Sequence, residues 1–151
     1  MIVKGGRTNY GELIGILMLD TKFPRIYGDI GNALTFSFPV KYKKVVGATS
    51  QRVVKEADSS LIQPFIEAAK ELKEEGISAI TTSCGFLAVF QEYLAEAVNV
   101  PVFSSSLLQV PMVYRMLKKG QKVGIMTASK PHLTQLHFKG AGASHIPMVV
   151  Y

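Results

Sequence analysis

The stretch AITTSCGFLAVFQEYLAEA, residues 79 to 97, decides the fold class. It opens with a short β-branched run, which is typical of a buried strand. An amphipathic helical pattern begins directly after Cys84 and Gly85. The stretch therefore predicts a strand that turns sharply into a helix, with the only cysteine of the chain at the corner. Corners of this kind hold nucleophiles and acid–base groups in α/β enzymes, and they are equally ordinary places for a buried small residue.

Strands and helices are expected to alternate on both sides of this corner. Apolar runs predict strands over residues 13–19, 44–49, 77–83, 101–103, 121–129 and 146–151, and helical patterns predict helices over 59–76, 85–98, 105–118 and 130–139. Residues 1–12 are expected to form a flexible or edge segment, and residues 20–36 a long loop of the kind that is often functional. The alternation predicts an α/β fold with a mostly parallel sheet covered on both faces.

Polar clusters follow three of the expected strands. They are Asp20-Thr21, Thr82-Ser83-Cys84-Gly85 and Thr127-Ala128-Ser129. In parallel sheets the ligand binds outside the carboxyl ends of the strands. We therefore expect the three clusters to converge on one crevice.

Cys84 is the residue of this group with the richest chemistry. A thiol at a helix N-terminus meets unpaired N–H groups and the positive end of the helix dipole, so we expect its pKa to be lowered. The thiolate would act as a nucleophile or as the base for a carbon acid. The hydroxyls of Thr82 and Ser83 and the N–H groups of residues 85 and 86 are suited to a carboxylate. A buried structural cysteine is an alternative of about equal weight.

Other polar residues carry weaker signals. Asp20 suits a substrate amine or, equally, a turn that ends a strand, and Arg25 is expected to be a solvated loop residue rather than a carboxylate ligand. His132, His137 and His145 are expected to lie on the surface or to line helices, although a Cys–His hydrolase would need one beside the thiol. The histidine spacing lacks a carboxylate cluster, so no metal site is expected. No phosphate-binding or dinucleotide motif is present.

Composition and charge limit the function classes. A chain of 151 residues with 48% hydrophobic residues is long enough for one good core. No apolar run is long enough for a membrane helix and no secretory signal is apparent. A single cysteine forms no internal disulfide, so a cytoplasmic location is expected. The net charge of +6 is scattered, which argues against nucleic-acid binding and is compatible with a small anionic substrate.

Three stretches carry a family resemblance. They are GILMLDTKFPRIYGDIGN (15–32), ITTSCGFLAVFQEYLAEAVNVPVFSSSLLQVP (80–111) and KVGIMTAS (122–129). Together they resemble the aspartate/glutamate racemase superfamily, which includes hydantoin racemases, maleate isomerases and arylmalonate decarboxylases. The resemblance covers most of the chain and is most specific at the cysteine corner. It implies a parallel-sheet, three-layer fold of two similar α/β lobes, with the active site between them and no cofactor.

The resemblance also implies roles for single residues. In the racemases, one cysteine from each lobe flanks the substrate α-carbon, and one removes a proton while the other delivers one. Cys84 matches the first-lobe cysteine and is therefore expected to be the α-proton base. The expected substrate-binding residues are Asp20, Thr21, Thr82, Ser83, Gly85, Phe86, Thr127 and Ser129.

Two departures from the family shape the expected function. Gly85-Phe86 stands where amino-acid racemases have Asn-Thr, and the second cysteine of the family has no counterpart. We expect residues 1–103 to form the first lobe and 104–151 the opening of an incomplete second lobe, with a homodimer covering exposed apolar surface. The expected function is a cofactor-independent amino-acid or hydantoin-type racemase. The alternatives are a one-cysteine isomerase, decarboxylase or thiol hydrolase on the same fold, or a truncated, non-catalytic anion-binding member.

Overall fold

The computed structural model describes residues 5–6 and 10–151, so the segment expected over residues 1–12 lies largely outside the described residues. The strands are β1 (Ile14–Met18), β2 (Val40–Lys44), β3 (Ala79–Thr82), β4 (Val102–Phe103), β5 (Val123–Ile125) and β6 (Met148–Val150). The α-helices are α1 (Ile62–Glu74), α2 (Gln91–Ala97), α3 (Val110–Arg115) and α4 (Gln135–Gly140). Short turns of 3₁₀ or π-helix join them, notably η2 (Gln51–Lys55), η4 (Gly85–Phe90), η5 (Ser106–Gln109) and η6 (Lys130–His132).

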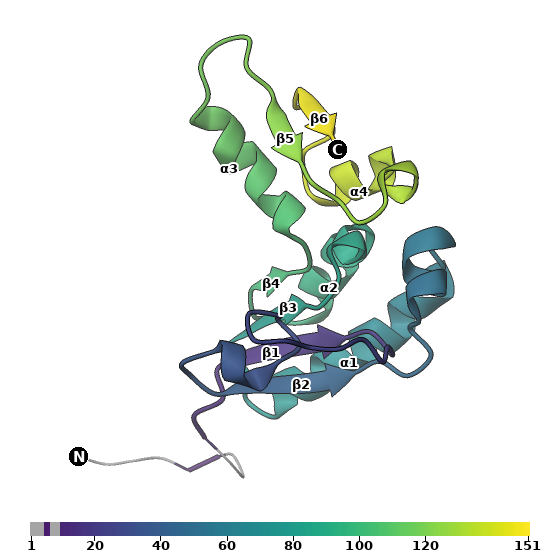
Figure 1. Ribbon diagram of the computed structural model, residues 1–151. Coiled ribbons are helices and arrows are strands. Elements are labelled where there is room, and N and C mark those ends of the chain that lie inside the picture. The colour runs from purple at the N-terminus through teal and green to yellow at the C-terminus, as the bar shows by residue number, and fades with distance from the viewer. Residues whose placement is uncertain (1–4, 7–9) are drawn as a thin grey trace, which may run out of the picture.

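Two parallel sheets form the framework. The first has the strand order β2-β1-β3-β4, and the second consists of β5 and β6 (Figure 1). Within the first sheet Ile16 lies opposite Tyr42 of β2 and Thr81 of β3. Every strand pair is parallel, so the carboxyl ends of each sheet lie together at one edge. The predicted α/β fold class is confirmed, while the division into lobes at residue 103 and the homodimer remain predictions.

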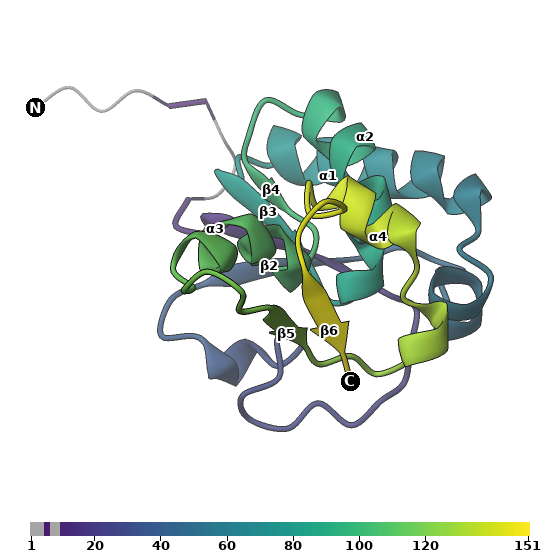
Figure 2. The ribbon, with the colours of Figure 1, turned by 90° about the horizontal axis from the view of Figure 1, so that it is seen from above.

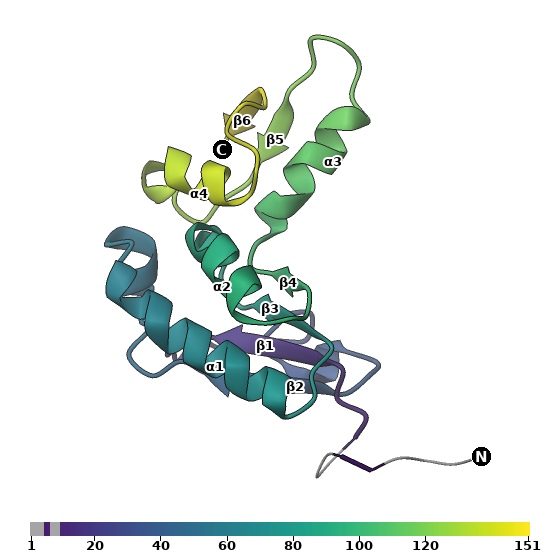
Figure 3. The ribbon, with the colours of Figure 1, turned by 180° about the vertical axis from the view of Figure 1, so that it is seen from behind.

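Helices α1 and α2 cover the first sheet and contact each other (Figure 3). The side chains of Phe65, Leu72 and Leu94 on these helices are buried in the first hydrophobic cluster. Gly15 lets β1 approach α1 closely, because a Cβ atom there would lie 2.9 Å from Leu72 Cδ1. The sheet is therefore anchored from one face, which fixes the position of its carboxyl edge.

A second hydrophobic cluster joins the two sheets. It contains Ile125 of β5, Phe138 of α4 and Ala88 of η4, so it spans residues from both halves of the chain. Helix α4 rests directly on η4, as the view from above shows (Figure 2). A Cβ atom at Gly140 would lie 2.0 Å from the Ala88 carbonyl oxygen, so the contact requires glycine. This packing holds the end of β5 opposite the cysteine corner.

The strand expected over residues 44–49 was placed too late in the sequence. The edge strand β2 ends at Lys44, and the following residues form a turn in which Gly47 has a φ of +77°. The Asp20 N–H donates to the Ala48 carbonyl oxygen at 2.9 Å, which closes this turn against β1. The apolar pair Val45-Val46 was misleading because two adjacent valines are typical of a strand. In the structure both follow the strand, with Val45 buried in the turn and Val46 exposed.

In the described part of the chain, no helix combines the length and the apolar character needed to cross a membrane.

Candidate active site

A cleft of about 1000 Å³ lies between the carboxyl edge of the first sheet and the end of β5. The three polar clusters predicted to converge all contribute to its lining. The predicted site residues in the lining are Thr21, Ser83, Cys84, Gly85, Phe86, Thr127 and Ser129. Asp20 and Thr82 are not among the lining residues.

Cys84 sits at the turn from β3 into η4, with an extended backbone (φ −143°, ψ 117°). Its side chain lines the cleft and is partly buried against the first hydrophobic cluster. Burial raises the pKa of the Cys84 thiol, and the N–H groups of Phe86 and Leu87 oppose that rise. The expected lowering of this pKa was therefore wrong. The helix start does favour the thiolate, but the cost of removing the sulfur from water is the larger effect.

Thr82 supports the cysteine corner from behind. Its hydroxyl lies 2.7 Å from the Ser104 carbonyl oxygen and 3.1 Å from that of Cys84. The Cys84 N–H donates to the same hydroxyl at 3.4 Å. Since Thr82 is 7% exposed, its hydroxyl ties the end of β3 to the segment after β4 rather than facing the cleft.

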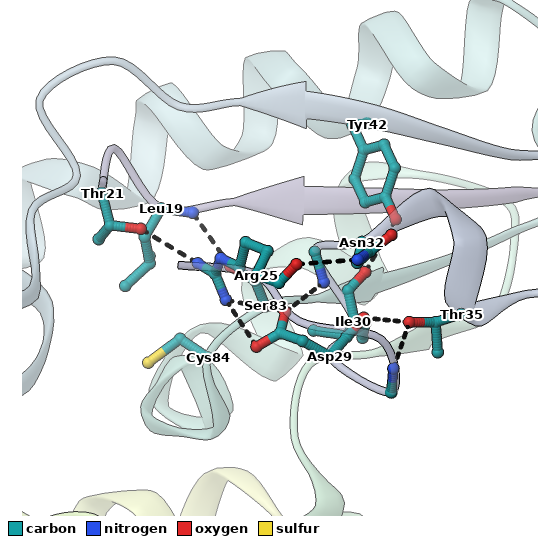
Figure 4. A network of polar contacts seen from close by, with 12 residues as sticks. Leu19, Thr21, Arg25, Asp29, Ile30, Asn32, Thr35, Tyr42, Ser83 and Cys84 are labelled. Carbon is teal, nitrogen blue, oxygen red and sulfur yellow. Dashed lines mark hydrogen bonds and ion pairs between the residues drawn. The ribbon is translucent and has the colours of Figure 1, made fainter. Parts of the chain in front are cut away.

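Ser83 faces the cleft and is fixed by β1. The Leu19 N–H donates to its Oγ at 3.1 Å (Figure 4). The Ser83 N–H donates to the Leu17 carbonyl oxygen at 2.9 Å. Oγ acts as an acceptor here, and the hydroxyl proton has no hydrogen-bond acceptor among the described residues.

Asp20 serves the turn after β2. Its carboxylate accepts a hydrogen bond from the Gly47 N–H at 3.0 Å and pairs with Lys44 at 3.2 Å. The Gly47 N–H, followed by Lys44, lowers the pKa of the Asp20 carboxyl group. The structure therefore places this carboxylate beside the cleft, in contact with β2, and not in the cleft lining.

The second wall carries a hydroxyl–imidazole pair. The Ser129 N–H donates to the Thr127 hydroxyl at 3.4 Å, and Ser129 Oγ lies 2.7 Å from His132 Nδ1. His132, which was expected on the surface or along a helix, lines the cleft. One feature of the sequence could have predicted this place in the cleft: His132 follows the strand-end cluster 127–129 by three residues.

The other two histidines lie elsewhere. His137 is 1% exposed and packs edge-on against Phe86, with ring centroids 5.2 Å apart. Burial lowers the pKa of His137, and the Thr134 N–H donates to its Nδ1 at 3.1 Å. His145 is exposed. Through its contact with Phe86, His137 supports the floor of the cleft from α4.

The cleft lining includes the cationic side chains of Arg25 and Lys55, and no Asp or Glu occurs among its described residues. Arg25 is paired with the carboxylate of Asp29, which lies outside the lining, at 3.1 Å. Arg25, expected to be solvated, is thus a cleft residue that sequence reasoning missed. Clusters of three or more His, Cys, Asp or Glu side chains suited to a metal ion are absent from the described regions.

Structure comparison gives the fold. An aspartate racemase homologue from Pyrococcus horikoshii OT3 matches 93% of this chain and 64% of its own, with a TM-score of 0.52 and 16% identity. A mutant of arylmalonate decarboxylase in a sulfate-associated form matches 91% of this chain and 60% of its own, with a TM-score of 0.56 and 15% identity. The chain thus has the fold of these two proteins.

Sequence comparison points to a different activity. Dimethylsulfoniopropionate lyase 7 of Emiliania huxleyi (strain CCMP1516) is 34% identical over 117 residues, which cover 77% of this chain and 34% of that protein. A dimethylsulfoniopropionate lyase of Durusdinium sp. clade D is 32% identical over 126 residues, covering 82% of this chain and 42% of that protein. The chain therefore spans about a third to two fifths of the length of these relatives. No protein-family model matches.

These relatives overturn the expected racemase function. The curated proteins that resemble this sequence are lyases, at 29–34% identity over most of the chain. The alternative of another one-cysteine reaction on the same fold agrees better with them than inversion of an amino acid or hydantoin does.

Proposed function

We propose that this chain is the cysteine-bearing part of a dimethylsulfoniopropionate lyase built on the racemase-type fold. The observation that carries the proposal is Cys84 in a cleft lined also by Arg25 and Lys55, in a sequence whose curated relatives are such lyases. The named substrate is a carboxylate with a sulfonium group on the carbon β to it. A base at Cys84 and an anion-binding wall are the parts that its cleavage needs.

The reaction is a β-elimination with one base. The Cys84 thiolate removes a proton from the carbon next to the carboxylate, and the electron pair of that C–H bond forms a C=C bond. The bond from the β-carbon to sulfur breaks, and its electrons leave with sulfur. The products are acrylate, neutral dimethyl sulfide and a protonated Cys84. Because the leaving group departs without needing a proton, no second acid is required, whereas inversion by the racemase route uses two thiols.

The burial of Cys84 suits this role. Burial raises the pKa of the thiol, so the thiolate, once formed, is a stronger base toward carbon, while the N–H groups of Phe86 and Leu87 favour its formation. The Ser83 hydroxyl faces the same cleft and has its proton free to donate. Donors directed at the substrate carboxylate stabilise the negative charge that develops as the proton leaves. The cleft thus combines a strong base with donors for the charge it creates.

The test is release of dimethyl sulfide from dimethylsulfoniopropionate. Headspace gas chromatography and proton NMR should show sulfide and acrylate in equal amounts with the wild-type chain. Cys84→Ser should reduce the rate by about 10²- to 10⁴-fold, the range for loss of a general base. The exposed Ser144→Ala serves as the matched control and should retain the wild-type rate. Equal rates for wild type and Cys84→Ser, or no sulfide from the wild-type chain, would refute the proposal.

A further inference from the structure

The long loop between β1 and β2 is folded around its own hydrogen bonds (Figure 4). The Asn32 side-chain amide donates to the Arg25 carbonyl oxygen at 2.8 Å, and the Tyr42 hydroxyl donates to the Ile30 carbonyl oxygen at 3.0 Å. The Thr35 hydroxyl donates to the Asp29 carbonyl oxygen at 2.7 Å. These bonds give the loop one defined shape and fix the backbone at Arg25.

The Arg25 side chain is held as firmly as its backbone. Nη1 donates to the two Asp29 carboxylate oxygens at 3.1 and 3.3 Å, and Nη2 donates to the Thr21 hydroxyl at 3.1 Å. Its stem packs on Gly31, where a Cβ atom would lie 3.0 Å from Arg25 Cδ. The guanidinium carbon lies 5.6 Å from the centre of the Phe23 ring. The guanidinium is thereby preorganised, so binding a ligand costs it little further side-chain entropy.

The Arg25 guanidinium has N–H groups that are not used in these hydrogen bonds. It carries five N–H groups, and the hydrogen bonds it makes to described residues use Nη1 and Nη2 only. Part of Nη2 is left without a partner in that set, as is the Nε–H, although Nε itself packs on Gly31, where a Cβ atom would lie 3.0 Å from it. Arg25 and Thr21 line the cleft that contains Cys84, and Figure 4 shows the guanidinium and the Cys84 side chain on the same side of the strand ends.

We propose that Arg25, set in place by Asp29 and Thr21, binds the carboxylate of the ligand that reaches Cys84. The proposal deepens the lyase function and rests on it for the identity of the substrate. It gives Arg25 the role of a specificity-determining residue, since it selects acids over their neutral amides. Lys55 is a second cation in the lining, but its ammonium group lacks the planar fork of donors that a guanidinium has.

Alkylation of the single cysteine tests this without requiring turnover. Iodoacetate and iodoacetamide have the same reactive CH₂ group, which Cys84 Sγ attacks while the C–I bond breaks and iodide leaves. They differ in that one carries a carboxylate and the other a neutral amide. Intact-mass spectrometry gives the two rate constants for the full chain, each divided by that of free cysteine in the same buffer. The ratio of the two values is the acid preference of the site.

We expect the wild-type chain to prefer iodoacetate and Arg25→Gln to lower the ratio roughly tenfold, the value of one charge-assisted hydrogen bond. Arg25→Lys, which keeps the charge but loses the fork, should lower it less. Lys22→Gln removes the same charge from the same loop outside the cleft lining and should leave the ratio unchanged. A change in loop stability alone would alter both rates together, and a melting curve of each variant checks that it is folded.

An unchanged ratio in Arg25→Gln would overturn the proposal, as would an equal fall in Lys22→Gln or the absence of any Cys84 adduct. The lyase assay separates the two proposals. An Arg25-dependent preference for the acid without release of dimethyl sulfide would support the carboxylate site and refute the lyase function. Release of dimethyl sulfide without such a preference would refute the role proposed for Arg25 and would leave the lyase proposal intact.

Discussion

The two walls of the cleft begin from the same local structure and differ in what surrounds it. At each corner a threonine lies at or just after the end of a parallel strand, and its hydroxyl accepts the N–H two residues later, at 3.4 Å for both Thr82 and Thr127. Cys84 and Ser129 then have similar extended backbones, with φ of −143° and −153°, and a 3₁₀ helix follows each. The corner geometry is thus shared, while the side chain is a thiol at one corner and a hydroxyl at the other.

The two corners differ in how deeply they are buried. Thr82 is 7% exposed and also bonds to the segment after β4, and Cys84 packs against the first hydrophobic cluster. Thr127 is only half-buried, and Ser129 is bonded to its neighbour His132. The first corner is therefore built from contacts distant in sequence, and the second from local ones. The thiol thus lies where the fold limits its contact with water, and the more open corner places hydroxyl and imidazole groups on the opposite wall.

The largest expected effect comes from breaking the packing between the two halves. In Gly140→Ala the new Cβ would meet the Ala88 carbonyl oxygen, so α4 must move away from η4. We expect a loss of about 3 kcal/mol in the free energy of unfolding. For a chain of this size this corresponds to a fall in Tm of about 6–12 °C.

Differential scanning calorimetry would measure it. Gly124→Ala is the control, because its Cβ meets only Tyr151 at an ordinary 3.6 Å. Equal melting temperatures for the two variants would show that the close contact at Gly140 does not join the halves.

A smaller effect should distinguish the two threonines. Thr82→Val leaves the Ser104 carbonyl oxygen without the hydroxyl that lies 2.7 Å from it in a buried place, at a cost of about 2 kcal/mol. Thr127→Val loses a single weak bond in a half-buried position and should change stability by less than about 0.5 kcal/mol. Urea unfolding of both variants measures the difference, and similar losses would mean that the two corners are equally supported.

The smallest effect concerns pH. His137 is buried and its pKa is lowered, so the unfolded chain binds a proton at a higher pH than the folded chain does. The stability that this group contributes is present above its ordinary pKa of about 6.5 and is lost as the pH falls toward the folded value. Tm should therefore be lower at about pH 5 than at about pH 7, by more in the wild type than in His137→Leu. An identical decline in both would assign the acid sensitivity to other groups.

Local sequence signals were sufficient for the cysteine corner. The apolar run before Thr82, the glycine after Cys84 and the helical pattern beyond predicted a strand that turns into a helix, and both are present. The convergence of the strand ends followed from the parallel sheet. The second strand was misplaced because Val45 is buried in a turn, where burial and strand propensity give the same apolar signal.

The sequence by itself determined the α/β class, the place of Cys84 at a strand end and the excess of basic residues, because these depend on local periodicity and composition. Only the tertiary structure decided that Asp20 binds the turn after β2, that Arg25 and His132 enter the cleft, and that burial raises the pKa of Cys84. Each of these depends on groups far apart in the chain. Whether a side chain meets water, a partner or a cleft is set by packing, which local sequence does not encode.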